Sequence, residues 1–129
     1  MTATSIATNV RGVLATALGT VAASVYASVP EAVIPPACVI VPDVDYMESM
    51  LIGKSVVKVK LNFVITAVVA YNSNAGALDN LEKLIISILS VIPAGYVVGN
   101  VSQPSITSVG ASPMLVSDVK VSTYYNQIN

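Results

Sequence analysis

Residues 55–71, SVVKVKLNFVITAVVAY, form the stretch of sequence that decides the fold. Apolar side chains alternate there with polar ones, a period of two that is typical of a β-strand with one buried face. The apolar positions are Val57, Val59, Leu61, Phe63 and Ile65, and the polar ones are Lys58, Lys60, Asn62 and Thr66. From Val64 onward the polar side also becomes apolar, so we expect the far half to be covered on both sides. A strand this long is expected to bend, or to project as a hairpin with the segment before Gly53.

The residues that follow predict a helix. Asn72, Ser73 and Asn74 offer side-chain oxygens that can cap its first turn, and Asp79 and Glu82 lie near the positive end of its dipole. Its apolar positions recur at helical spacing and comprise Leu78, Leu81, Leu84, Ile85, Ile88, Leu89 and Ile92. The sequence Pro-Ala-Gly at residues 93–95 then ends the helix.

Further strands are predicted on both sides of this strand–helix unit. Residues 96–101 and 114–125 are typical of two closing strands, joined by a connection rich in Gly, Ser and Pro at residues 102–113. Upstream, residues 37–41 predict a short strand that Pro42 and Asp43 close. Residues 45–52 are either a second strand or an extended arm.

The first part of the chain, residues 5–26, predicts a helix rich in Ala and Thr. Residues 12–29 carry no charge, which raises a membrane anchor or a secretory signal peptide as alternatives. The strong apolar residues recur every three or four positions, and this stripe favours a helix packed by one face on its own domain. They are Ile6, Val10, Val13, Leu14, Ala17, Leu18, Val21 and Val25. The whole chain, residues 1–129, therefore predicts one α+β domain in which two helices pack on an antiparallel-rich sheet of about four to five strands.

Charge is scarce in this chain. Only 10% of the 129 residues are charged and 54% are hydrophobic, whereas an ordinary soluble domain has about 25% charged residues. Lipid or other protein chains are therefore expected to cover part of the surface. Six basic residues against seven acidic ones leave no cationic excess for binding nucleic acid through its phosphates.

Groups for catalysis are equally scarce. The chain has no His, which excludes Ser–His–Asp and Cys–His systems within the chain, and Cys38 is its single Cys. Ser55 and Lys58 match a Ser-x-x-Lys spacing, but on a strand they point to opposite faces. We therefore expect no enzyme activity, no cofactor and no metal site.

Six of the thirteen charged residues lie within residues 43–60. The acidic part of this segment can be a solvated loop or a hard-cation site, and its lysines can be a solvated edge or a docking surface. Its apolar residues can be core or interface. We expect partners to meet here, and the candidate interface residues are Asp45, Tyr46, Met47, Glu48, Met50, Leu51, Lys54, Lys58 and Lys60.

In length and order of elements the chain resembles the tail terminator proteins of long-tailed (siphovirus-type) bacteriophages. The resemblance lies in the first helix at residues 5–26, in the proline-bracketed strand IPPACVIVP at 34–42, and in the long strand at 56–71. That strand runs into the helix GALDNLEKL at 76–84, and two closing strands follow. The resemblance implies a structural virion protein that forms a hexameric ring on the last ring of the tail tube. Such a ring stops tube growth, joins the head through a head-completion or connector protein, and lets DNA pass through its lumen unread.

The resemblance also implies a location at the head-proximal end of the virion tail, and in the host cytoplasm during assembly. A closing ring buries two different patches on each subunit. We expect one patch at the hairpin of residues 45–58 with the basic start of the long strand, and another at the sheet edge formed by the last strand. The alternatives are a head–tail connector or tail-tube subunit of the same phage type, and a small secreted or membrane-associated domain.

Overall fold

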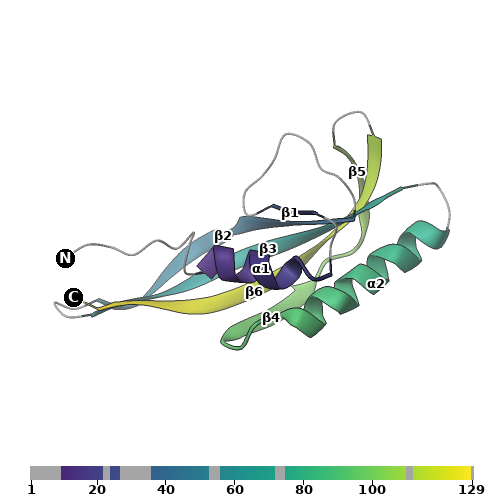
Figure 1. Ribbon diagram of the computed structural model, residues 1–129. Helices are drawn as coiled ribbons and strands as arrows, with labels where there is room; N and C mark the ends of the chain where they lie inside the picture. Colours follow the sequence, from purple (N-terminus) through teal and green to yellow (C-terminus); the bar gives the residue numbers. More distant parts are fainter. Residues whose placement is uncertain are drawn as a thin grey trace.

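The computed structural model describes residues 10–21, 24–26, 36–52, 56–71, 75–109 and 112–128. Two helices pack on a mixed, mostly antiparallel sheet of six strands, which confirms the α+β prediction with more strands than expected (Figure 1). The helices are α1 (Gly12–Leu18) and α2 (Ala75–Val91). The strands are β1 (Ser24–Tyr26), β2 (Ala37–Ile52), β3 (Val56–Ala70), β4 (Tyr96–Val101), β5 (Ser105–Val109) and β6 (Ser112–Ile128). Their order is β1-β2-β3-β6-β4, and β5 also pairs with β6.

The central strand is β3, as its alternating sequence predicts. It pairs antiparallel with β2 on one side and with β6 on the other, where the register runs without a break from Val56 opposite Ile128 to Ala70 opposite Met114. Leu61, Phe63 and Ile65 are fully buried against the two helices. The predicted turn at Gly53 lies outside the described residues, although β2 and β3 do pair as a hairpin up to Ile52 opposite Val57.

The second predicted helix is α2. Leu81, Leu84 and Ile88 are buried against the sheet, as the helical spacing of apolar residues predicts. The predicted cap at residues 72–74 lies outside the described residues. After the helix the chain turns at Gly95, whose φ of +93° is a conformation that side chains other than Gly rarely adopt.

The prediction of one helix over residues 5–26 is wrong in its extent. In the described part α1 ends at Leu18, the chain turns at Gly19, and β1 pairs parallel with the first residues of β2. Leu14 and Leu18 are fully buried, so the predicted stripe does pack inward over this short helix. The helix ends early because the backbone of β1 forms hydrogen bonds with that of Ala37–Val39 instead of continuing the helix. This pairing partner lies more than ten residues away, so the local sequence pattern does not predict it.

The prediction that Pro42 and Asp43 close a short strand is also wrong. β2 continues through Pro42 to Ile52, with a register shift between Pro42 and Met47. Pro is tolerated in a strand where one side has no neighbouring strand or where a bulge follows, and both conditions hold here, because the described pairing of β1 reaches only Val39.

The connection predicted at residues 102–113 contains a strand. β4 pairs with β6 as far as Val101, and β5 then pairs with an earlier part of β6, from Ser105 opposite Val116 to Val109 opposite Ser112. β4 and β5 are therefore two parts of one broken edge, and β6 begins at Ser112. The predicted outer position of the last strand is wrong, because β6 lies between β3 and this edge.

The two faces of the sheet differ in chemistry. Residues of β3, β6, α1 and α2 form the main core on the helix-covered face. On the opposite face Ala37, Val68 and Met114 form a small second cluster with Tyr26 and Val116. The rest of that face mixes valines, among them Val39, Val41 and Val64, with polar register pairs such as Asn62 with Ser122 and Thr66 with Asp118.

Candidate subunit interfaces

A bulge in β2 shapes the segment that the sequence singles out as an interface. Pro42 stands opposite Phe63 and Met47 opposite Leu61, so residues 43–46 face Asn62 alone. The bulge turns Tyr46 toward the core, where its ring packs edge-on against the ring of Phe63 with 5.4 Å between the two ring centroids. It leaves the side chain of Val44 96% exposed.

Hydrogen bonds give the bulge a defined shape. Asp43 accepts a bond of 2.8 Å at Oδ1 from the backbone N–H of Val44. Nδ2 of Asn62 donates to the backbone carbonyl of Asp45 at 2.7 Å and to Oε2 of Glu48 at 2.6 Å. The hydrogen bonds from Asn62 on the central strand therefore fix the backbone conformation of the bulge. The ordered bulge in turn keeps Val44 exposed to solvent.

The charged groups around the bulge lie in loose pairs. Nζ of Lys60 is 3.9 Å from Oε2 of Glu48, and Nζ of Lys120 is 3.8 Å from Oδ2 of Asp43. Lys58 places its amine 5.0 Å from the centre of the Tyr124 ring. Partly exposed pairs of this kind contribute little to stability, typically below about 1 kcal/mol. Their effect is to neutralise this surface locally.

The structure brings together part of the predicted interface. Asp45, Met47 and Glu48 are exposed beside one another on β2, and Lys58 and Lys60 lie on the adjacent strand. Tyr46 is half-buried against Phe63 and therefore belongs to the core. Met50 and Leu51 lie in β2 by their backbone, and the description does not extend to their side chains. Lys54 lies outside the described residues.

The opposite edge of the sheet, from Tyr96 to Val109, carries no charged residue. Large apolar side chains are exposed along it, with Val97 at 60% and Ile106 at 57% exposure, and Val98 and Val101 between them. Sequence reasoning missed this surface because the Ser and Pro residues of 102–113 predicted a loop. The available signal was the pair of β-branched residues Ile106 and Thr107.

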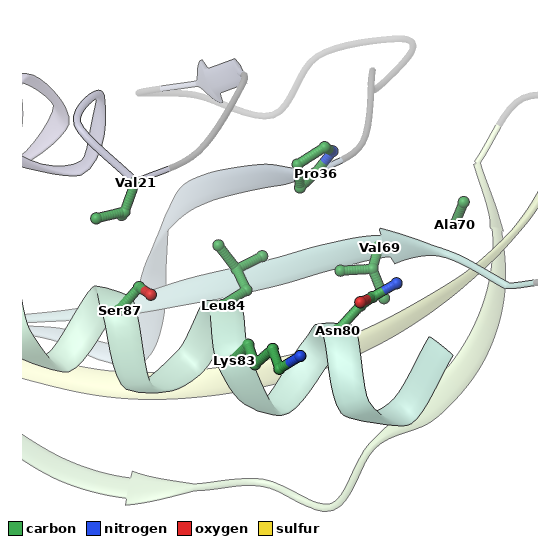
Figure 2. A pocket seen from close by; sticks show the side chains of 8 residues that line it. All are labelled: Val21, Pro36, Val69, Ala70, Asn80, Lys83, Leu84 and Ser87. Carbon is green, nitrogen blue, oxygen red and sulfur yellow. The ribbon is translucent and has the colours of Figure 1, made fainter. Parts of the chain in front are cut away.

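A pocket of about 380 Å³ lies between α2, the end of β3 and the start of β2 (Figure 2). Its lining comprises Val21, Pro36, Val69, Ala70, Asn80, Lys83, Leu84 and Ser87. Lys83 already binds Oδ2 of Asp79 at 2.9 Å, and this hydrogen bond raises the pKa of the lysine. The lining therefore offers one amine, one amide and one hydroxyl, without an acid–base pair.

Two other kinds of reactive site, a nucleophilic thiol and a metal-binding cluster, were sought among the residues that the structure describes. Cys38 is fully buried, and burial raises the pKa of its thiol to about 12, so that it stays protonated. The described residues contain no group of three His, Cys, Asp or Glu side chains that could hold a metal ion.

Neither α1 nor α2, the helices of the described part, combines the length and hydropathy that a membrane-spanning helix needs. A comparison with protein-family models finds none that matches the chain, and a comparison with curated proteins finds no significant match.

Proposed function

We propose that this chain is a structural subunit that joins copies of itself head to tail in a closed ring. The proposed ring is a tail terminator, the family that the chain resembles in length and order of elements, with six subunits on the last ring of a phage tail tube. In this role it ends tube polymerisation and presents the surface that a head-completion or connector protein binds. DNA passes through its lumen without sequence-specific contacts.

The observation that carries the proposal is the difference between the two open edges of the sheet. A head-to-tail contact that closes into a ring buries two unlike patches on every subunit. The bulged edge of β2 is lined by acidic groups around the exposed Val44. The β4–β5 edge, on the far side of the same sheet, is uncharged and exposes Val97 and Ile106. The two patches are unlike and belong to opposite edges of the sheet, with one hollow between them that Asp43 and Val97 both line.

The chemistry of the chain also supports a structural role over a catalytic one. Only 10% of the residues are charged, so the exposed apolar groups need a protein surface to cover them in the assembled state. The pocket of about 380 Å³ beside α2 lacks an acid–base pair, and the chain has no His. The open hollow of about 270 Å³ at the bulge is lined by Asp43, Asp45, Glu48 and Lys120, of which Asp43 is paired with Lys120 and Glu48 is bound by Asn62. An active site would have to be built from isolated surface groups.

The mass of the assembly tests the proposal. Light scattering coupled to size exclusion is expected to give a discrete complex of about six subunits whose mass stays constant as concentration rises. Electron microscopy of the same sample is expected to show rings. A stable monomer at all concentrations contradicts the proposal, and long tubes formed by the chain alone identify a tail-tube subunit instead.

A further inference from the structure

The edge formed by β4 and β5 is open to solvent. Among the strands that the structure describes, both pair with β6 alone, on the side of β6 that faces away from β3. Residues 96–109 carry no charge, and Val97, Val101 and Ile106 are exposed along them. An open edge without charges pairs readily with a strand of another chain, and repeated pairing of this kind produces fibres. This edge therefore needs some other protection.

The register against β6 shows an interruption in the edge. Val101 lies opposite Val119, and Ser105 lies opposite Val116. Three residues of the edge therefore lie between these two pairs, whereas β6 has two residues there. One extra residue disrupts the ladder locally and bends the strand. The edge is consequently broken into two short runs instead of forming one long strand.

Hydrogen bonds to β6 hold the break in a defined conformation at Ser102. Its backbone N–H donates to the carbonyl of Asp118 at 2.8 Å, and its hydroxyl accepts a bond of 2.9 Å from the backbone N–H of Asp118. The buried hydroxyl of Ser117 donates to the Ser102 carbonyl at 2.6 Å. Thr66 of β3 in turn donates to Oδ1 of Asp118 at 2.8 Å. The break is therefore an ordered part of the fold, supported by two strands of the sheet.

Pro104 adds a second obstacle at the same place. Proline has no backbone N–H, so it cannot donate to a strand on either side. A strand from another chain therefore finds no continuous ladder across the break, and the run available to it beyond Pro104 is limited to the five residues of β5. The extra residue and the proline act together to shorten the edge.

We propose that the break at residues 102–104 protects the β4–β5 edge against strand addition, so that partners bind this edge through its exposed side chains and not through backbone pairing. The proposed ring uses the same edge as one of its patches, and the inference adds how that patch avoids open-ended association. Head-to-tail contacts that do not close produce filaments, so a subunit of a closed assembly gains from excluding strand addition.

Deleting Gln103 and replacing Pro104→Thr in the same chain tests the proposal. The deletion leaves two residues opposite two on β6, so that the register becomes continuous from Val101 to Val109, and the substitution restores the missing N–H. We expect this double variant to form assemblies whose mass, measured by light scattering, rises with concentration beyond that of the wild-type chain. Thioflavin T fluorescence of the same samples is expected to rise as strands stack.

Ser105→Val is the matched control, because it makes the same exposed edge more apolar and leaves the break intact. It should keep the wild-type mass. Equal association of the control and the double variant overturns the inference, because apolar surface alone then drives it. A double variant that folds and keeps the wild-type mass also overturns it.

Urea denaturation shows whether the double variant folds. If it does not, Pro104→Thr alone decides the question, because it restores the donor and leaves the chain length unchanged. This single variant is expected to associate more than the wild-type chain, and an unchanged mass overturns the inference. The mass of the wild-type chain tests the proposed function alone, so the failure of either proposal is recognised separately.

Discussion

Asn62 donates a hydrogen bond of 2.6 Å from Nδ2 to Oε2 of Glu48. The same nitrogen donates to the carbonyl oxygen of Asp45 at 2.7 Å. One amide on the central strand therefore holds two positions on β2, inside and just after the bulge. The bulge exposes Val44 at the proposed interface. The conformation of that interface therefore depends on the side-chain amide of Asn62, which the central strand β3 holds in place.

Replacing this amide by an acid tests the link. Asn62→Asp keeps the volume but removes both donated bonds at neutral pH and places a carboxylate beside Glu48. We expect the free energy of unfolding to fall by about 1–3 kcal/mol at pH 7, measured by urea denaturation. The deficit against wild type should shrink near pH 4, where protonation restores a donor. Ser122→Ala, the register partner on the same face, is the control, and an unchanged stability of Asn62→Asp at pH 7 contradicts the assignment.

The packing of α2 on the sheet predicts a sharp contrast between two isoleucines two residues apart. Ile88 is fully buried, so Ile88→Ala should lower the free energy of unfolding by about 2–5 kcal/mol. Ile86 is 66% exposed, and Ile86→Ala should change it by no more than about 0.5 kcal/mol. Chemical denaturation of both variants measures the difference, and equal losses would show that the helix packs by another face.

Burial of Cys38 predicts a loss of stability at high pH. Its pKa rises from an ordinary value of 9.0 to about 12 in the folded chain, so the unfolded state loses this proton first. The stabilisation is complete below pH 9 and is lost as the pH rises from there toward 12. Burial raises the pKa of Tyr96 as well, which acts in the same direction.

Thermal unfolding across this pH range checks the prediction. Cys38→Ala should flatten the decline above pH 9 relative to wild type, whatever its stability at neutral pH. An identical slope in the two proteins would show that ionisation of the Cys38 thiol does not control the decline.

The turn after α2 predicts a position where only glycine is tolerated without strain. Gly95 has a φ of +93°, and its carbonyl accepts a hydrogen bond of 2.9 Å from the hydroxyl of Thr123. Gly95→Ala should lower the free energy of unfolding by about 1–2 kcal/mol, because a Cβ is disfavoured at positive φ. Gly76→Ala lies within α2 on an exposed position and should leave stability equal or slightly higher. Urea denaturation compares the two substitutions.

Hydrophobic periodicity was sufficient to predict the helix and the strand in which it is strongest. The alternation in 55–71 predicts β3, and the helical spacing from Leu78 to Ile88 predicts α2, because each pattern reports a face buried by local geometry. β1 and β5 have three and five residues and depend on distant partners, so the local sequence gives no signal for β1 and only the pair Ile106 and Thr107 for β5. The bulge escaped prediction because Pro42 and Asp43 are equally typical of a strand end.

The candidate interface was predictable to a similar degree. A concentration of charge, with six of the thirteen charged residues in residues 43–60, correctly indicated exposed groups at Asp45 and Glu48. It could not distinguish Tyr46, which packs on Phe63, from the exposed Met47 next to it. The edge position of β4 and β5 was not predictable, because an edge is defined by which strands pair, and here it depends on β6 lying inside the sheet.

The inner position of β6 has a consequence for how the chain acquires its structure. β6 follows every other described element in the chain, yet β3, β4 and β5 all pair with it. Its pairs with β3 join residues from 44 positions apart, at Ala70 and Met114, to 72 positions apart, at Val56 and Ile128. Such distant pairing slows folding, because loop closure must precede the contacts that stabilise it. During synthesis β3, β4 and β5 therefore lack a strand partner until residues 112–128 have left the ribosome.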